Sequence, residues 1–307
     1  EVTNVSQMRD GDFIVESNRG LIAAQNIVAA TGPFQTPVIP SIIADDCVHQ
    51  IHSSGYRKPE QLDDGAVLVV GAGSSGSQIA DELLRAGRKV YLSIGPHDRP
   101  PRSYRGKDFV WWLGKLGKWQ MKTPPIGKDH VTIAVSGAYG GKTVDFRKFA
   151  SRGMVLLGMT ETYDNGVITF AGDLKQNIAD GDANYLGLLA EADEYIRAYD
   201  LDFPAEEEAK ILMPDPECLA KPIRQLELEE AGIRTIVWAT GYRQDFSWLK
   251  ADVFDDQNQP VHKKGVTNVN GVYFLGLPWL TMRGSSFIWG VWEDAKYLAG
   301  YIAKSGS

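Results

Sequence analysis

Three glycines, Gly71, Gly73 and Gly76, have the spacing of a turn that binds the pyrophosphate of a dinucleotide. The first permits a tight bend, the second lets the backbone approach the ligand, and the third allows a helix to pack closely on a strand. Ser74 and Ser75 complete the turn, and the backbone amides that open the next helix would face the phosphates. This stretch predicts a dinucleotide-binding site.

The residues on either side of the turn predict the elements that position it. The apolar, β-branched run at 67–70 indicates a buried strand, and apolar residues at helical spacing indicate an amphipathic helix over 77–86. Gly87 would end that helix, and the run at 89–94 predicts a second strand. Strand, turn, helix and strand in this order form the repeating unit of a doubly wound α/β sheet.

The end of the second strand indicates which dinucleotide to expect. Sites for NAD usually carry an Asp or Glu there, which binds the ribose 2′-hydroxyl. Here Ser93 occupies that place, and Arg99 and Arg102 follow in the loop. Guanidinium groups suit a 2′-phosphate, so we expect NADPH. Asp98 is an alternative acid, although it comes late in the loop.

Length and composition bound the function. The 307 residues suffice for one large domain or two of moderate size. A net charge of -7 without a long Lys/Arg run gives little support to nucleic-acid or anionic-membrane binding. There is no apolar run of transmembrane length and no signal peptide. Cys47 and Cys218 are far apart and form no metal or disulfide framework, so we expect a cytoplasmic protein.

The rest of the chain predicts further strands and helices of an α/β protein. Its first 30 residues read as a β-meander, and Asp164-Asn165-Gly166 is a strong hairpin turn. Expected strands outside the dinucleotide unit are 2–8, 13–17, 21–24, 27–30, 131–135, 154–157, 160–163, 167–170, 233–239 and 272–276. Expected helices are a short one near 111–116, then 143–150, 185–199 and one beginning near 293.

The stretch 136–143 nearly matches the phosphate loop of nucleoside triphosphatases. Ser136 stands where the first glycine of that motif belongs, which puts a side chain at the tightest bend. None of the later expected strands ends in an acid suited to hold Mg²⁺. We therefore favour a glycine-rich surface turn, with a nucleoside triphosphatase as the alternative.

Four short motifs follow one another along the chain. They are Ala30-Thr31-Gly32 with Phe34, Pro37 and Pro40, then His52-Ser53 with Tyr56, then 71–76, then Ala239-Thr240-Gly241-Tyr242. In this order they resemble the motifs of the flavin-containing monooxygenases and their bacterial relatives. The resemblance covers essentially the whole chain, and the bacterial branch labelled as flavoproteins of potassium transport is the most similar. It implies an enzyme in which NADPH reduces FAD, a flavin hydroperoxide forms with dioxygen, and a small nucleophilic or carbonyl substrate is oxygenated.

Two departures from the family pattern limit what the resemblance implies. Asp46 and Val48 stand where the family has Phe and Gly, so the subtype of oxygenation stays open. The family also begins with an FAD-binding unit that has its own GxGxxG, whereas this sequence has one such turn, which we assign to NADPH. We therefore expect an incomplete FAD site. A missing N-terminal segment or a second chain would complete it, and the chain alone would purify without FAD.

The architecture implied is α/β with two dinucleotide-binding domains, a Rossmann-like NADPH domain at 41–239 inserted into a partial FAD domain at 1–40 and 240–307. By resemblance, both Ala-Thr-Gly motifs lie near the nucleotides, while Asp294 and the loop 283–286 approach the flavin. His52 would lie near the nicotinamide. A structural histidine, hydrogen-bonded within a linker, is the equal alternative.

Other classes of protein stay possible. A disulfide reductase of the thioredoxin-reductase type shares the two-nucleotide layout but needs a CxxC pair, which this sequence lacks. A chain without its FAD turn is alternatively an NADP-binding module with no activity of its own. An NAD(P)H-dependent flavin oxidoreductase that does not oxygenate a substrate is a third possibility.

Overall fold

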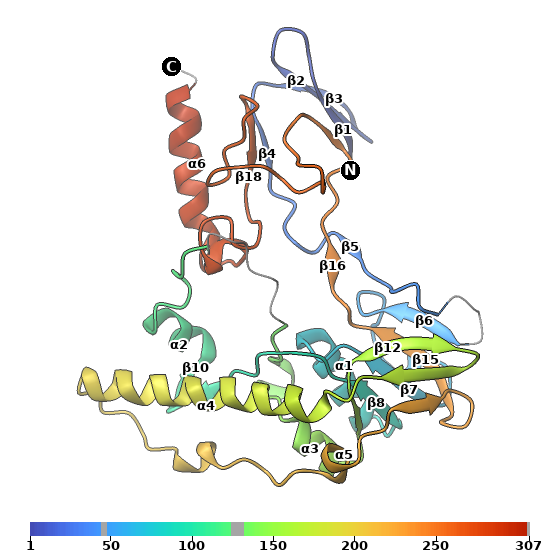
Figure 1. The fold of residues 1–307 in the computed structure, drawn as a ribbon. Coiled ribbons are helices and arrows are strands. Elements are labelled where there is room, and N and C mark those ends of the chain that lie inside the picture. The colour runs from blue at the N-terminus through green and yellow to red at the C-terminus, as the bar shows by residue number, and fades with distance from the viewer. Residues whose placement is uncertain (44–47, 124–131, 306–307) are drawn as a thin grey trace. The chain divides into compact units, whose positions relative to one another are not determined.

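The computed structural model describes residues 1–43, 48–123 and 132–305, and Figure 1 shows the fold. The chain divides into two compact units. Unit 1 comprises residues 1–36, 117–130 and 242–307, and unit 2 comprises 37–116 and 131–241. The expected boundaries at 40/41 and 239/240 stay predictions. They did not include the return of the chain to unit 1 at 117–130.

Unit 2 is built on a parallel five-stranded sheet with the strand order β11-β8-β7-β15-β6 (Figure 1). Its central strand β7 is buried at every residue, as expected for a parallel sheet covered on both faces. The α/β class predicted from the sequence is confirmed. The strands are β6 (His49–His52), β7 (Ala66–Val70), β8 (Val90–Ser93), β11 (Val155–Leu157) and β15 (Ile233–Trp238).

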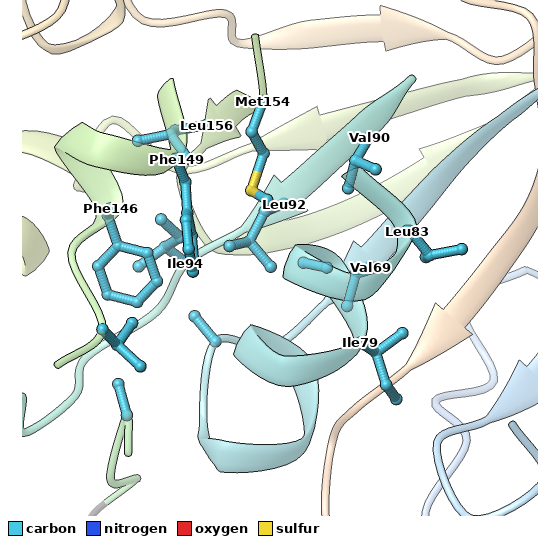
Figure 2. Packing of buried hydrophobic residues seen from close by; sticks show 14 of the residues in the cluster. Val69, Ile79, Leu83, Val90, Leu92, Ile94, Phe146, Phe149, Met154 and Leu156 are labelled. Carbon is cyan, nitrogen blue, oxygen red and sulfur yellow. The ribbon is translucent and has the colours of Figure 1, made fainter. Parts of the chain in front are cut away.

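Helix α1 (Ser74–Arg85) packs its apolar stripe on one face of this sheet. Figure 2 shows Ile79 and Leu83 of this helix in the same core cluster as Val69 and Leu92 of the strands. The predicted helix at 77–86 is confirmed and begins three residues earlier. The other helices of the unit are α2 (Phe109–Lys115), α3 (Phe146–Ser151), α4 (Leu174–Ala198) and α5 (Glu217–Ala220), with 3₁₀ turns η1 (Pro59–Gln61), η2 (Ala138–Gly140) and η3 (Glu207–Lys210).

A three-stranded antiparallel sheet contributes to the second core cluster of unit 2. Its hairpin turns at Asn165 (φ 46°) and Gly166 (φ 87°), as the Asn-Gly pair predicted. Ile168 and Phe170 from the hairpin cluster with Trp238 of the parallel sheet. The strands are β12 (Thr160–Asp164), β13 (Val167–Phe170) and β14 (Gln225–Glu227), and a separate short ladder joins β9 (Ser103–Tyr104) to β10 (Lys107–Asp108).

Two expectations for unit 2 were wrong. The expected strand at 131–135 is only a single parallel bridge between Ile133 and Asp98, and residue 131 lies outside the described residues. Helix α4 begins eleven residues before the expected 185, because its first half buries polar residues that break the apolar pattern. Asn177 donates to the backbone carbonyl of Ile94, and Asp182 is buried in an ion pair.

Unit 1 contains the predicted meander, a parallel two-stranded sheet and the C-terminal helix (Figure 1). The run at 27–30 does not continue the meander, because β4 pairs in parallel with β18 instead. The strands are β1 (Val2–Gln7), β2 (Phe13–Ser17), β3 (Gly20–Ala24), β4 (Ile27–Ala29), β17 (Leu249–Lys250) and β18 (Val272–Phe274), followed by the 3₁₀ turn η4 (Arg283–Ser286) and helix α6 (Val291–Ser305). Strands β5 (Thr36–Pro37) and β16 (Tyr242–Arg243) form a further pair.

The core of unit 1 is aromatic and well covered. Phe274 is fully buried against Phe246 and Phe254, and Tyr273 is also buried. Only Val28 of the parallel pair is exposed, at 42%. Segments of unit 1 itself therefore cover both aromatic residues of β18.

Two kinds of feature do not occur in the described part of the chain. None of its helices combines the length and apolar character needed to cross a bilayer. Within the same residues, no group of three or more His, Cys, Asp and Glu side chains is placed to bind a metal ion.

Candidate functional site

The glycine turn follows β7 and requires glycine at two of its positions. A Cβ on Gly76 would lie 1.8 Å from the carbonyl oxygen of Gly71, which no side chain can occupy. Gly71 has a φ of +100°, and a Cβ there would lie 2.5 Å from the carbonyl oxygen of Ala239. The turn is thus packed tightly on the opening of α1 and on the end of β15.

The opening of α1 presents free backbone donors. The first helical hydrogen bond runs from the Ser77 amide to the Gly73 carbonyl. The amides of Ser74, Ser75 and Gly76 have no hydrogen-bond partner among the described residues. These donors, together with the positive end of the helix dipole, fit a dinucleotide pyrophosphate. The dinucleotide fit therefore rests on geometry as well as on the motif.

A segment that no sequence motif connects with the turn forms one side of it. The Ser74 hydroxyl donates to the carbonyl of Ile133 at 2.9 Å, and a Cβ on Gly73 would lie 3.0 Å from Cγ2 of Thr132. Residues 132–135 therefore lie against the second glycine and the first helical residue. Sequence reasoning missed this segment, since its position depends on contacts across about 60 residues of sequence.

The second Ala-Thr-Gly lies beside the turn. The Ala239 amide donates to the carbonyl of Val70, the last residue of β7. The Thr240 hydroxyl donates to the carbonyl of Val38, and the Val38 amide donates to the carbonyl of Gly241. This motif thus joins the incoming and outgoing connections of unit 2 next to the glycine turn, and its role at a nucleotide stays a prediction.

His52 is a buried residue at the end of β6, only 6% exposed. Its Nδ1 accepts from the Ser54 amide at 3.1 Å, so the ring proton is on Nε2, which donates to the carbonyl of Gly241 at 2.9 Å. Both ring nitrogens are therefore engaged by protein atoms. This geometry favours the structural histidine over a catalytic one.

Ser93 is a structural residue in this fold. Its side chain is buried, donates to the carbonyl of Gly158 at 2.9 Å, and accepts from both the amide and the hydroxyl of Thr160. The hydroxyl thus connects β8 by hydrogen bonds to the segment that follows β11. The geometry does not support the expectation that Ser93 contacts the cofactor.

The side chain of Arg99 is likewise bound by other residues of unit 2. It is 5% exposed, its guanidinium donates to Asp182 at 2.6 Å and to the carbonyl of Val144 at 3.1 Å, and it stacks on Tyr185 at 4.4 Å. A buried guanidinium with these partners is not available to a 2′-phosphate. The expectation for Arg99 is therefore corrected: it stabilises α4 against the loop that follows β8.

Arg102 forms an ion pair with Asp108, and its amide donates to the hydroxyl of Thr143 at 2.9 Å. Its side chain packs on Gly141, where a Cβ would lie 2.9 Å from Nε of Arg102. This places Arg102 at the glycine-rich loop 136–143 rather than at the turn 71–76. The structure does not bring it together with Gly73 or Ser74.

That glycine-rich loop lacks the surroundings of a phosphate loop. In place of the preceding strand there is only the bridge at Ile133, and α3 starts at Phe146, beyond the end of the motif. Tyr139 inside the loop adopts a left-handed φ of +52° and is exposed. The arrangement supports the surface turn rather than the nucleoside triphosphatase.

Unit 1 contains a second candidate site at the opening of α6. Asp294 is 2% exposed, and its Oδ1 accepts from the hydroxyl of Thr281. Its Oδ2 is buried and has no hydrogen-bond partner within the described residues. The neighbouring Ser285 hydroxyl accepts from the amides of Thr281 and Met282. An unpartnered buried carboxylate oxygen is costly, which fits a group that donates to it when bound.

The first Ala-Thr-Gly directly follows β4 in unit 1. Gly32 has a φ of +70°, and the Gln35 amide nitrogen donates to the Thr31 hydroxyl at 2.9 Å and to the Gly32 carbonyl at 2.8 Å. Ala30 and Gly32 are therefore part of an ordered turn at a strand end. The structure shows no contact that assigns this motif to a nucleotide, so that role stays a prediction.

Comparison with known proteins gives the family. A family model described as pyridine nucleotide-disulphide oxidoreductase matches residues 1–113. A CzcO-like protein of Geobacillus kaustophilus, named an uncharacterized oxidoreductase, is 34% identical over 300 residues, which are 96% of this chain and 70% of that protein. The CzcO protein of Bacillus subtilis is 32% identical over 97% of this chain and 70% of its own length.

Proteins named as monooxygenases match as well. The flavin-containing monooxygenase iboF of Amanita muscaria is 38% identical over 97 residues, which are 29% of this chain and 18% of that protein. Among solved structures, a flavin-containing monooxygenase from Stenotrophomonas maltophilia superimposes with a TM-score of 0.60 at 16% identity, covering 100% of this chain and 71% of that one, which supports the fold. This chain therefore belongs to the flavin monooxygenase-like family of oxidoreductases that includes the CzcO-like proteins.

Proposed function

We propose that this chain works in an FAD-dependent monooxygenase that takes electrons from a nicotinamide dinucleotide and oxygenates a small nucleophilic or carbonyl substrate with dioxygen. The observation that carries the proposal is the glycine turn 71–76. Two of its glycines leave no room for a side chain. The backbone amides of residues 74–76, at the start of α1, have no hydrogen-bond partner among the described residues. Family membership supports the flavin part of the proposal.

Each cofactor would be held by residues already described. The amides of 74–76 would bind the pyrophosphate of the dinucleotide. Oδ2 of Asp294 would accept a hydrogen bond from a hydroxyl group of FAD, which would satisfy its missing partner. When bound, FAD would accept a hydride from the dinucleotide and reduce dioxygen, so that one oxygen atom enters the substrate and the other leaves as water.

The sequence favoured NADPH as the dinucleotide. That preference rested on Ser93, Arg99 and Arg102, whose side chains are engaged within unit 2. The family supports NADPH as a plausible cofactor. The monooxygenase chemistry is the same with either form of the dinucleotide, because the two differ only at the ribose 2′ position, away from the hydride.

A disulfide reductase is the second class that the family model suggests. Its chemistry needs a reactive thiolate with a resolving cysteine close by. Burial raises the pKa of the Cys218 thiol, which makes it a poor nucleophile. Cys47 lies outside the described residues, and the sequence has no CxxC pair. The described residues therefore give this alternative no support.

The proposal is tested on the purified chain in two steps. Calorimetric titration with dinucleotide measures binding at the turn, and absorbance after incubation with FAD and desalting measures flavin retention. Oxygen consumption is then followed with FAD, dinucleotide and a panel comprising a thioether, a tertiary amine and a cyclic ketone. Product analysis separates oxygenation of the substrate from simple oxidation of the dinucleotide.

The outcomes distinguish the candidate functions. Oxygenated product that depends on both cofactors supports the proposal. Dinucleotide oxidation without product points to a flavin oxidoreductase and contradicts oxygenation. Dinucleotide binding without flavin retention points to a binding module, as the expected incomplete FAD site implies. Failure to bind any dinucleotide contradicts the central role assigned to the turn.

A further inference from the structure

We infer that Thr123 is a positioning residue for the proposed flavin site, because its hydrogen bonds hold the segment that places Asp294. The inference rests on the proposed function, which gives Asp294 the role of a flavin ligand. By sequence, Thr123 falls inside the range 41–239 expected for the NADPH domain, whereas in the structure it belongs to unit 1. A residue from the middle of the chain would thus shape the site at the opening of α6.

Thr123 ends a segment, 119–123, that runs antiparallel to the segment 281–284 within unit 1. Three backbone hydrogen bonds of 2.8 to 3.2 Å join the two segments. These bonds run from the amide of Gly284 to the carbonyl of Trp119, from that of Arg283 to Met121, and from that of Thr123 to Thr281. The two segments therefore hold each other in register, as neighbouring antiparallel strands do.

The side chain of Thr123 adds a contact to a strained residue. Its hydroxyl donates to the carbonyl of Trp279 at 2.5 Å. Trp279 has a φ of +56°, a left-handed conformation that a bulky residue rarely adopts and that its surroundings must maintain. The hydrogen bond from Thr123 is one of the interactions that maintain it.

Two residues beyond Trp279, the chain reaches the residue that holds Asp294. The hydroxyl of Thr281 donates to Oδ1 of Asp294. The carbonyl of Thr281 accepts from the Thr123 amide, and its own amide donates to the Ser285 hydroxyl at 3.1 Å. Thr123 therefore fixes the chain both at Trp279 and at Thr281. If this chain shifts, the Thr281 hydroxyl shifts with it.

The carboxylate of Asp294 depends on this support. It is 2% exposed, and among the described residues only the Thr281 hydroxyl donates to it. The direction of the unpartnered Oδ2 therefore follows the position of Thr281. A hydrogen bond from FAD to Oδ2 requires that direction to be fixed, since such bonds weaken steeply when they are misaligned.

The experiment compares Thr123→Val, which keeps the shape of the side chain and removes the hydroxyl, with Thr123→Ser, which keeps the hydroxyl. Hydrogen exchange of the full chain, followed by mass spectrometry, measures the protection of the amides in 279–285 without any cofactor. These amides should exchange about fivefold faster in Thr123→Val and at the original rate in Thr123→Ser. Thr3→Val removes a hydroxyl-to-carbonyl hydrogen bond from the meander of the same unit, and it should leave these rates unchanged.

A titration with FAD separates a positioning role from a merely structural one. Thr123→Val should raise the dissociation constant about fivefold, measured by flavin fluorescence quenching, and Thr123→Ser should not. In the background of Asp294→Asn, the valine substitution should have no further effect, because Thr123 acts through Asp294. A general loss of stability would instead weaken FAD binding equally in both backgrounds.

Three results would overturn the inference. The first is unchanged hydrogen exchange at 279–285 in Thr123→Val. The second is equal weakening of FAD binding by the valine substitution with and without Asp294. The third is a serine variant as defective as the valine variant, with its fold intact by circular dichroism. In each case an unaltered chain that binds FAD leaves the proposed function standing. Absence of FAD binding to the unaltered chain would instead contradict the flavin part of the proposed function, and with it the role of Thr123 at a flavin.

Discussion

The imidazole of His52 donates from Nε2 to the carbonyl oxygen of Gly241, a residue 189 positions later in the chain, at 2.9 Å. The strands that lead to these two residues are neighbours, since His52 pairs with Trp238 in the parallel sheet. The hydrogen bond therefore fixes the second Ala-Thr-Gly at the end of β6, beside the glycine turn. We therefore expect His52 to influence the proposed nucleotide site through this backbone position.

Replacing His52 should lower stability. In His52→Ala the partly buried amide of Ser54 loses its acceptor, while the Gly241 carbonyl keeps its hydrogen bond from the Val38 amide. We expect the free energy of unfolding to fall by about 1–3 kcal/mol, measured by urea denaturation. His52→Asn, which retains an acceptor near the position of Nδ1, should lose less. Equal stability of the alanine variant and the unaltered chain would show that the ring contributes nothing.

Gly73→Val should abolish dinucleotide binding and leave the fold intact. The new Cβ would lie 3.0 Å from the methyl group of Thr132, which can shift, and 3.9 Å from the carbonyl oxygen of Ile133. The valine side chain would fill the space through which a phosphate approaches the amides of α1. Calorimetry measures binding, and thermal denaturation checks the fold. The double variant with Thr132→Ser removes the contact within the protein, so it should recover any lost stability without recovering binding. If either variant binds dinucleotide normally, residues 71–76 form a structural turn and not a binding site.

The sequence predicted those features whose contacting residues are close together in the chain. The hairpin at Asn165-Gly166 and the turn at 71–76 were predicted because local backbone chemistry determines both. The first half of α4 was missed because Asp182 interrupts its apolar face, and the partner that makes this acceptable, Arg99, lies 83 residues away. A buried ion pair between such distant residues leaves no periodic signal in either segment.

The same limit applied to the candidate site. Arg99 and Arg102 were predicted to bind a phosphate because both follow the strand β8. The sequence does not distinguish an arginine beside a binding site from one that packs on a distant helix. The segment 132–135 has no motif, and only its contact with Ser74 shows that it borders the turn. Asp98, considered from the sequence as a late acid, pairs through its backbone with Ile133 of this segment.

Ser93→Ala separates a structural role from a cofactor role. The variant loses the hydrogen bond to the Gly158 carbonyl and leaves the partly buried amide of Thr160 without its acceptor. We expect the free energy of unfolding to fall by about 1–3 kcal/mol. The affinities for NAD⁺ and NADP⁺ should not change, because this hydroxyl is fully engaged within the protein. A selective loss of NADP⁺ affinity at unchanged stability would restore Ser93 as a ligand of the 2′-phosphate.

Stability should fall as the pH drops below about 6.5, because His97 is buried and His262 is half-buried, both in the neutral form. Burial lowers the pKa of His97, with Arg99 adding to the effect, and burial also lowers that of His262. Nε2 of His97 packs on Gly181 and has no acceptor among the described residues, so a proton there would be unpartnered. In the unfolded chain each imidazole takes up a proton near its ordinary pKa of 6.5.

The sign and the pH window follow from these shifts. Below pH 6.5 the unfolded state binds protons that the folded state does not, so each histidine lowers stability by up to about 1.4 kcal/mol per pH unit until its folded pKa is reached. Burial raises the pKa of Asp81, but hydrogen bonds from Arg85 and Arg152 hold it below 3.8. The stability that the ionised Asp81 contributes is therefore lost only at a lower pH than the histidine effect. Urea denaturation from pH 8 to 5 measures the slope. His97→Gln should flatten it, and an unchanged slope would exclude His97 as a cause.

Asp294→Asn should weaken FAD binding without weakening the fold. The asparagine keeps an oxygen for the Thr281 hydroxyl, but it replaces the unpartnered Oδ2 by an amide donor and removes a buried charge. Unfolding by urea should therefore show equal or higher stability, since an uncompensated buried charge is costly.

If Asp294 accepts a hydroxyl of FAD, loss of that charged acceptor should raise the dissociation constant about tenfold or more, measured by flavin fluorescence quenching on titration. The exposed Asp256 of the same unit supplies the matched control, because Asp256→Asn makes the same change of charge at the surface. Comparable weakening in both variants would indicate a general charge effect. Unchanged FAD affinity in Asp294→Asn would mean that the unpartnered oxygen serves another purpose and that the flavin contact lies elsewhere in the chain.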